Sequence, residues 1–368
     1  MRNIIVLFGG VSVEHDVSIL TGITAINSLD EKKYNPIPVY LSRDGRFFTG
    51  KSLLDLDSYK NLPLKNLIEV CFISPNPVLY KKGLNRVKKI CDVYACVNCL
   101  HGGMGEDGSI SGLMNVINIP TTCSNVLASS VSMDKHFTKI VLKSLNIKHL
   151  PSVLVSSVFE FHKYEDKLTY PIIVKPNLLG SSIGIARADN REQAVRAILE
   201  ALKYGEKSII EPCLTDFIEI NCAAYLDYNG KIVVSEVEKP IRNNDLLDFD
   251  DKYKSGEREF PANVSNSIRK RVRLITEKVY LALNMNGFVR IDFLVKQNDI
   301  YLNEINSVPG SLAYYLFTPT FSEFSEILSN VIERSVKMAN KRASEVKTFD
   351  SGILSGRGAK GTKCLKKK

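Results

Sequence analysis

The chain has no hydrophobic run long enough to form a secretion signal or to cross a membrane. Its amino terminus, MRNIIVLFGG, carries an apolar run over residues 4–8 and then two glycines. A signal-peptide core needs at least about 7 apolar residues, and a membrane helix needs about 20. We therefore interpret this run as a first β-strand and expect a cytoplasmic protein without membrane association.

The eight cysteines lack the arrangement that metal binding or disulfide bonding requires. Cys96 and Cys99 form a CxxC pair, but no second Cys or His pair lies at ligand spacing. The cysteines sit in apolar surroundings such as EVCFIS and EINCAAYL. Without a secretion signal, free buried thiols are the better interpretation.

The net charge of +9 does not describe a basic surface for nucleic acid. From Lys341 to the end, nine Lys/Arg stand against two acidic residues, which leaves only +2 for the first 340 residues. The basic segment, residues 346–368, is rich in Gly, Ser and Lys, a composition typical of a poorly ordered tail. We expect no nucleic-acid partner.

Three stretches of the chain have different patterns, which predicts an α/β protein of three domains. Residues 1–122 alternate apolar runs with helical pieces, as in a parallel α/β domain. Residues 123–212 resemble a small central α+β domain that starts with one helix near 125–146. Residues 213–345 predict a C-terminal mixed-sheet domain with a polar loop, long helices near 264–284 and 322–342, and a hairpin.

The most informative segment is the hairpin GFVRIDFLVKQNDIYLNEINSVPGS, residues 287–311. A turn centred on Asn298 would pair Asp292 with Glu304 and Arg290 with Asn306, and alternation places these four polar side chains on one face. The other face carries Val289, Ile291, Phe293, Val295, Tyr301 and Ile305, with Asn303 as the exception. Two carboxylates and a carboxamide suit Mg²⁺, and a guanidinium suits a developing oxyanion. A half-exposed hairpin with one solvated charged face would show the same pattern.

Two further segments have features of nucleotide sites. In VKPNLLGSSIGI, Lys175 ends an apolar strand and a loop with Gly180, Ser181 and Ser182 follows. Such a loop can donate backbone N–H groups to phosphates, although its lysine precedes its glycines, unlike in a Walker A loop, and a plain turn would look alike. In IIEPCLTDFIEIN, Glu211 and Glu219 fit a hinge that holds adenine and ribose, or two surface glutamates.

Two glycine-rich loops follow predicted strands near the amino terminus. The spacing in FGGVSVEHDVS does not fit the dinucleotide motif GxGxxG, which disfavours a nicotinamide enzyme. Glu14 in this loop could hold the ammonium group of a small substrate. His101, in LHGGMGEDGSISG, lies where α/β sheets bind ligands, although a loop histidine can also be incidental.

Eight motifs in order resemble those of the D-alanine–D-alanine ligase family, a branch of the ATP-grasp ligases. The resemblance covers roughly residues 3–342, and the motifs read LFGGVSVEHDVS, LHGGMGEDGSISGL, ASSVSMDK, VKPNLLGSSIGI, IIEP…EIN, DDKYKSG, RIDFL and NEINSVPGSL. The resemblance implies an ATP-grasp fold. It also implies an enzyme that converts one D-alanine to an acyl phosphate with ATP and joins it to a second D-alanine for peptidoglycan synthesis.

The resemblance also implies a role for each matching residue. Lys135, Lys175, Ser182, Glu211, Glu219 and Lys252 would bind ATP. Asp292, Glu304 and Asn306 would hold two Mg²⁺ ions, or Mn²⁺ in their place. Glu14 would bind the first ammonium and connect through Ser181 to Tyr253, with His101 near the first carboxylate. Arg290 and the Gly310 N–H would stabilise the reacting groups, and Ser311 and Leu312 would hold the second carboxylate. A homodimer is the family expectation.

The chain also departs from the family pattern. Leu246 and Leu247 stand in the lid where aromatics are common, the hinge is one residue longer, and Ser311 directly follows Gly310. These changes concern the second amino-acid pocket most. A related ATP-grasp ligase with another second substrate, such as D-serine, and a nucleotide-binding regulatory protein without catalysis remain as alternatives.

Overall fold

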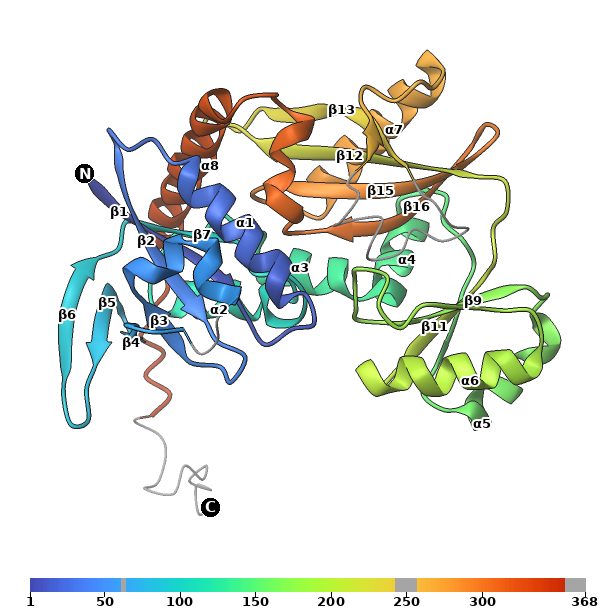
Figure 1. Cartoon of the computed structure of the whole chain (residues 1–368), viewed down its shortest axis with the longest axis horizontal. Helices are drawn as coiled ribbons and strands as arrows, with labels where there is room; N and C mark the ends of the chain where they lie inside the picture. Colours follow the sequence, from blue (N-terminus) through green and yellow to red (C-terminus); the bar gives the residue numbers. More distant parts are fainter. Residues whose placement is uncertain (61–63, 242–256, 355–368) are drawn as a thin grey trace, which may run out of the picture.

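The computed structural model describes residues 1–60, 64–241 and 257–354, which form three β-sheets with helices packed against them. The N-terminal and central sheets lie at opposite ends of the molecule in Figure 1, and the C-terminal sheet lies above and between them. The candidate site lies where the three sheets come together.

The N-terminal sheet has a parallel part, as predicted, and an antiparallel extension. The strands β1 (Arg2–Gly9), β2 (Tyr34–Leu41) and β7 (Ala95–Asn98) are parallel, with β1 in the middle. Residues 4–8 of β1 are all 0% exposed, as expected for a strand that is covered on both faces. The helices α1 (His15–Asn27) and α2 (Ser109–Val116) follow the loops after β1 and β7.

The prediction of parallel strands was wrong for the segment EVCFIS. It lies in β4 (Ile68–Ile73), which pairs antiparallel with β3 (Phe47–Thr49) and β5 (Asn76–Lys82), and β6 (Val87–Asp92) completes the edge. The turns between β4, β5 and β6 are too short for the crossover that parallel pairing needs. Residues 45–52, GRFFTGKS, match the letters of the Walker A pattern, but β3 runs through them, so they do not form a phosphate loop.

The central sheet has four antiparallel strands in the order β10-β9-β11-β8. These strands are β8 (Val153–Val155), β9 (Ile172–Pro176), β10 (Ala186–Ala188) and β11 (Ser208–Pro212). The helices α5 (Val158–His162) and α6 (Arg191–Ala201) pack against this sheet (Figure 1). Helix α6 buries Ala194, Ala197, Ile198 and Ala201, the spacing of one helical face.

The single helix predicted near 125–146 is two helices, α3 (Val126–Met133) and α4 (Lys135–Ser144). Asp134 between them has an extended backbone, and its carboxylate accepts the N–H of Phe137, so it caps α4. Ala128 of α3 and Leu142 of α4 belong to the core under the C-terminal sheet. This break places Lys135 in the first turn of α4, beside the candidate site.

The C-terminal sheet, predicted to be mixed, is antiparallel throughout its described strands. Its order is β14-β13-β12-β15-β16, because short turns join β12 to β13 and β15 to β16. The strands are β12 (Ile218–Leu226), β13 (Ile232–Pro240), β14 (Arg258–Glu259), β15 (Val289–Lys296) and β16 (Asp299–Asn306). Helix α7 (Asn266–Ala282) packs on one face, and the polar side chains of the hairpin lie on the other.

The predicted pairing of the hairpin is confirmed at its open end and wrong near the turn. Asp292 faces Glu304 and Arg290 faces Asn306, as predicted, but a bulge at Asn303 then shifts the register by one residue. Ile300 and Leu302 therefore point into the core, and Tyr301, which was predicted there, does not belong to it. The exceptional Asn303 is the extra residue of the bulge.

The remaining elements complete the frame around the site. Helix α8 (Phe321–Ala343) packs against the N-terminal core, and residues 345–354 after it have no regular structure. Short 3-10 helices are η1 (Lys51–Leu54), η2 (Leu56–Lys60), η3 (Gly103–Gly105), η4 (Glu165–Lys167), η5 (Leu202–Tyr204) and η7 (Gly310–Leu316). Within the described ranges, no helix is both long enough and apolar enough to cross a membrane. The seven cysteines in these ranges are free thiols.

Candidate active site

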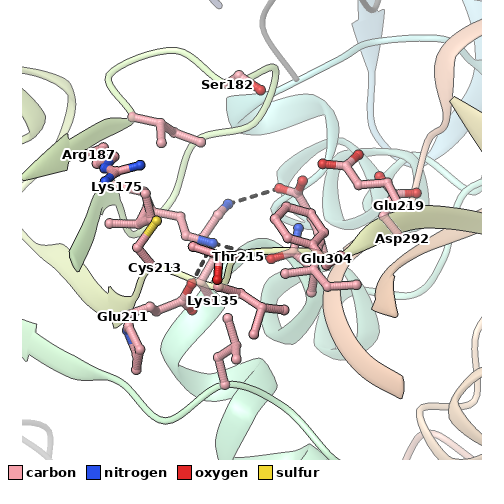
Figure 2. Close-up of a pocket in the computed structure, with 18 of the residues that line it drawn as sticks. Lys135, Lys175, Ser182, Arg187, Glu211, Cys213, Thr215, Glu219, Asp292 and Glu304 are labelled. Carbon is pink, nitrogen blue, oxygen red and sulfur yellow. Dashed lines mark hydrogen bonds and ion pairs between the residues drawn. The ribbon is translucent and has the colours of Figure 1, made fainter. Parts of the chain in front are cut away.

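A cavity of about 490 Å³ lies between the central and C-terminal sheets. Its walls come from β9, β11, β15, β16, the loop before β10 and the hinge over residues 212–217. Figure 2 shows Lys175 and Arg187 on one wall and Glu219 and Asp292 on the facing wall. Segments more than 100 residues apart in the sequence thus meet in one pocket.

The polar face of the hairpin forms one wall of the site. Arg290 donates two hydrogen bonds to Asp292, from Nε at 2.8 Å and from a terminal nitrogen at 2.9 Å. Asn306 donates to the same carboxylate at 3.0 Å. Burial alone would lower the pKa of Arg290, but Asp292 outweighs it and raises the pKa, so Arg290 is a fixed cation. The strands hold the backbone of these residues, which fixes the direction of their side chains.

Glu304 completes this wall and meets the first lysine of α4. Lys135 Nζ donates to Glu304 Oε1 at 2.9 Å and to the backbone oxygen of Leu179 at 2.6 Å. Lys135 is 9% exposed, so its side chain has little room to turn away. The loop after β9 and the hairpin are therefore joined through one ammonium group.

The residues present suit hard cations that are shared with a phosphate ligand. Asp292, Glu304 and Asn306 offer two carboxylates and a carboxamide oxygen, which are ligands that Mg²⁺ accepts. Within the ranges that the structure covers, no group of three His, Cys, Asp or Glu side chains is arranged to hold a metal alone. Such an open donor set is typical of Mg²⁺ sites that take their other ligands from phosphate and water.

Glu211 lies at the bottom of the pocket between two lysines. Its carboxylate pairs with Lys139 at 2.6 Å and with Lys175 at 2.7 Å, as the dashed lines in Figure 2 show for the residues drawn there. Burial alone would raise the pKa of Glu211, but Lys175 and Lys139 outweigh it and lower the pKa to about 2. Glu211 is 2% exposed, so the interpretation as a surface glutamate was wrong for this residue. Glu219 is partly exposed and lines the same cavity.

Sequence reasoning missed Lys139, Asn303 and Arg187, which belong to this pocket or support it. Lys139 follows Lys135 by one helical turn, and a lysine on the buried side of an amphipathic helix was the available signal. Asn303 accepts a hydrogen bond from Lys175 at 3.3 Å, which explains the polar exception on the apolar face. Arg187 lies just beyond the glycine loop motif and lines the cavity.

The loop after β9 reaches the first glycine loop of the N-terminal sheet. The Ser181 hydroxyl donates a short hydrogen bond to Glu14 Oε1, which is the predicted contact between these residues. Ser181 and Ser182 both have left-handed backbones, with φ of 54° and 58°. A side chain at Gly180 would come within 3.2 Å of the Glu14 carboxylate, so the loop backbone lies close to this group and even a methyl group there would crowd it.

A second link joins the N-terminal sheet to the loop after β16. The Thr21 hydroxyl oxygen accepts the N–H of Ser311 at 2.9 Å and lies 2.8 Å from His101 Nε2. Burial, and then repulsion by Arg290, lower the pKa of His101 to about 4, so this ring is neutral at pH 7. His101 is 5% exposed, and its proposed role near the first carboxylate stays a prediction. Sequence reasoning missed Thr21.

The residues after Gly310 have an unusual backbone. Ser311, Leu312 and Ala313 have φ of 49°, 54° and 52°, which costs non-glycine residues roughly 1–2 kcal/mol each. The Leu312 side chain packs in the N-terminal core, and its N–H donates to the oxygen of Pro309 at 2.9 Å. Gly310 is the first residue of η7 and lies between this turn and the hairpin.

Glu106 is another residue that the sequence reasoning missed. Its Oε2 accepts the N–H of Gly102 and its Oε1 accepts the N–H of Val308, both at 3.0 Å. Burial and then repulsion by Glu14 raise the pKa of Glu106 to about 8. The signal was present in the motif LHGGMGEDGSISG, where the acidic residue follows the glycines.

Several predicted residues fall outside the described ranges. Lys252 and Tyr253, with Leu246 and Leu247 of the predicted lid, lie in residues 242–256. Residues 355–368 of the predicted basic tail also lie outside them. Their roles stay predictions.

Comparison with known protein families agrees, along most of the chain, with the resemblance found in its motifs. The model for the N-terminus of D-ala D-ala ligases matches residues 3–124, and the model for their C-terminus matches residues 152–334. A D-alanine–D-alanine ligase from Thermosipho melanesiensis is 34% identical over 365 residues, covering 96% of this chain and 98% of that protein. The ligase from Macrococcus caseolyticus is 33% identical over 360 residues, covering 95% and 98%.

Solved structures with the same fold also carry this name or a related one. The D-alanine–D-alanine ligase of Coxiella burnetii has a TM-score of 0.78 at 23% identity, covering 93% of this chain and 96% of that one. The VanG D-Ala:D-Ser ligase of Enterococcus faecalis has a TM-score of 0.75 at 25% identity, covering 91% and 99%. The Bacillus anthracis ligase complexed with ATP has a TM-score of 0.66 at 22% identity, covering 93% and 100%.

Proposed function

The chain belongs to the D-alanine–D-alanine ligase family, and we propose how its own residues perform the ATP-dependent ligation that defines this family. The enzyme joins two D-alanine molecules into D-alanyl-D-alanine for peptidoglycan synthesis. One observation supports the assignment of residues best. Asp292 and Glu304, beside Arg290 and Asn306 on the polar face of the hairpin, line one cavity with Lys175, and Lys135 donates to Glu304 itself.

The cavity between the two sheets is the proposed ATP site. Lys135, Lys175 and Lys252 would neutralise the phosphates, and Ser182 would donate a hydrogen bond to them. Glu211 with the hinge after it would bind adenine, and Glu219 the ribose. Asp292, Glu304 and Asn306 would hold two Mg²⁺ ions, or Mn²⁺ in their place. Bound Mg²⁺ would neutralise phosphate charge during phosphoryl transfer.

A carboxylate does not react with an amine, so the first D-alanine must be activated. Its carboxylate oxygen attacks the γ-phosphorus of ATP, the bond to the ADP oxygen breaks, and an acyl phosphate forms. The second D-alanine loses a proton from its ammonium group, and the free amine attacks the acyl carbon. The C–O bond then breaks, phosphate leaves and the second amine proton is released. The Arg290 guanidinium and the Gly310 N–H would stabilise the negative oxygens of both steps.

The amino-acid sites would lie at the junction of the three sheets. Glu14 would bind the first ammonium group and is fixed by Ser181, with Tyr253 completing this connection. His101 is neutral at pH 7, so its ring would accept or donate a hydrogen bond near the first carboxylate without adding charge. Ser311 and Leu312 would hold the carboxylate of the second D-alanine.

A coupled assay of ADP release tests this assignment. We expect turnover with ATP, Mg²⁺ and D-alanine and none with L-alanine. Glu14 at the ammonium group and Arg290 at the reacting end of the substrate would together accept only one configuration of its α-carbon. Arg290→Ala should lower kcat by at least about 100-fold, the range for losing one oxyanion donor. Equal turnover of both enantiomers would refute the proposal.

D-Serine as second substrate is the alternative worth testing in the same assay. The chain resembles the VanG D-Ala:D-Ser ligase in fold, and Ser311 follows Gly310 without the usual intervening residues. A mixed D-alanyl-D-serine product at equal substrate concentrations would favour this alternative. We further propose that the enzyme acts in the cytoplasm, where ATP is available, and that it is a homodimer.

A further inference from the structure

The carboxylate of Glu106 joins two loops that belong to different parts of the molecule. Gly102 belongs to the loop after β7, while Val308 belongs to the loop after β16. One carboxylate oxygen accepts the N–H of each residue at 3.0 Å. Ser307 adds a third contact, because its hydroxyl donates to the backbone oxygen of Glu106 at 3.4 Å. A single side chain thus sets the spacing of the two loops.

On one side, Glu106 fixes the backbone that packs against Glu14. Gly102 has φ of 65°, and a side chain there would come within 2.4 Å of Glu14 Oε2 and of Ser12 Oγ. This loop therefore lies directly against the carboxylate that is proposed to bind the first ammonium group. Any shift of Gly102 would move the wall of that subsite.

On the other side, Glu106 fixes Val308, which leads into the loop that contains Gly310. Val308 is 3% exposed and is followed by Pro309 and Gly310, whose N–H is proposed to stabilise the developing oxyanion. The loop has a second anchor, since Ser311 donates to Thr21 at 2.9 Å. These two anchors lie on either side of Gly310.

Glu106 also lines a small cavity between these loops. The cavity has a volume of about 20 Å³, and its walls include Glu14, Glu106, Gly180 and Glu304. This volume is close to that of one water molecule or one ammonium group. Two carboxylates from different loops, Glu14 and Glu106, therefore surround a space that fits the amino end of the first substrate.

From these contacts we propose that Glu106 is a positioning residue for the first D-alanine. Through its two backbone contacts it holds the ammonium subsite at Glu14 and the oxyanion loop at Gly310 at a fixed separation. The inference rests on the proposed function. It predicts that the loss of Glu106 impairs D-alanine use and leaves ATP binding unchanged, because Glu106 does not line the ATP cavity.

The test is a kinetic comparison of Glu106→Gln with the unaltered chain. Glutamine keeps the size of the side chain, but its NH₂ group would face one of the two backbone N–H groups. We expect the KM for D-alanine at the first site to rise about 10- to 100-fold, the range for leaving one buried backbone N–H without its acceptor. The KM for ATP should stay within about twofold. Glu192→Gln, on the outer face of α6 with its side chain 80% exposed, is the matched control.

Each result of this comparison decides the role of Glu106. An unchanged KM for D-alanine, or an equal rise in the KM values for ATP and for D-alanine, would contradict the positioning role of Glu106. If Glu106→Gln does not fold, Glu106→Asp is measured by the same criteria, since its shorter carboxylate reaches one of the two loops at a time. An unaltered chain without D-alanine-dependent ADP release would refute the proposed function and this inference together. An active unaltered chain with a normal Glu106→Gln variant would refute the inference alone.

Discussion

Replacing Glu211 by glutamine should weaken the central domain by a predictable amount. The carboxylate is 2% exposed and pairs with Lys139 and Lys175, which lower its pKa to about 2 from an ordinary 4.5. This difference corresponds to about 3.5 kcal/mol of stability at pH 7, at about 1.4 kcal/mol per pH unit. Burial also lowers the pKa of Lys139, which means that part of this gain is offset. We therefore expect a loss of about 2–3 kcal/mol in Glu211→Gln.

The pH dependence gives this prediction a definite sign. Because the pKa of Glu211 is lower in the folded protein, its stabilisation is complete above pH 4.5 and is lost as the pH falls toward 2. The difference in stability between the unaltered protein and Glu211→Gln should shrink by roughly 1 kcal/mol between pH 7 and pH 3.5. This follows from the titration of one carboxylate in the folded and unfolded chains.

Native-state hydrogen exchange of the β9 and β11 amides is the suitable measurement. It reports the opening of one region, which matters in a protein with several domains that need not unfold together. Glu192→Gln on the same domain is the control and should change the opening free energy by less than about 0.5 kcal/mol. An equally small change in Glu211→Gln, or a difference that stays the same at pH 3.5, would refute the reasoning.

Two other predictions concern Asp292, a proposed metal ligand, and the buried histidine. Asp292→Asn should raise the Mg²⁺ concentration for half-maximal ADP release by at least about 10-fold, because one of two anionic ligands is lost. His101→Gln should flatten the dependence of stability on pH between 6.5 and 4, since the unfolded chain binds a proton in this range and the folded chain does not. Denaturation at pH 7 and pH 4.5 should show a loss of roughly 2–3 kcal/mol in the unaltered protein that is absent in the variant.

Each of these predictions has its own control. For Asp292→Asn, the KM for D-alanine at saturating Mg²⁺ should stay within about threefold, and an unchanged Mg²⁺ requirement would contradict the assigned ligand. For His101→Gln, the unaltered protein measured at the same two pH values is the reference. Parallel curves for His101→Gln and the unaltered protein would contradict its neutral, buried state.

The fold and the polar face of the hairpin could be predicted because they depend on local patterns. Alternation along two strands placed Arg290 opposite Asn306 and Asp292 opposite Glu304 at the open end, although the bulge at Asn303 made the predicted register wrong nearer the turn. The resemblance to the family also predicted the contact between Glu14 and Ser181, which lie 167 residues apart. Spacing alone could not have paired two loops so distant in the chain.

What could not be predicted depends on contacts between distant segments. No local pattern shows that Lys139 and Lys175 meet at Glu211, because their approach is set by the packing of α4 against the sheets. The role of Glu106 depends in the same way on Val308, which lies 202 residues further along the chain. The break of the helix at Asp134 was visible in principle, since aspartate is a preferred N-cap residue.

The bulge at Asn303 also has a consequence for how related chains can vary. Without this residue, Glu304 would still face Asp292, and Leu302 would still enter the core, so the hairpin would stay regular on both sides. The extra residue adds one amide that reaches Lys175 across the pocket. A deletion there would remove the contact to the lysine and spare Asp292 and Glu304, so the lysine side and the carboxylate side of the pocket can vary independently between related chains.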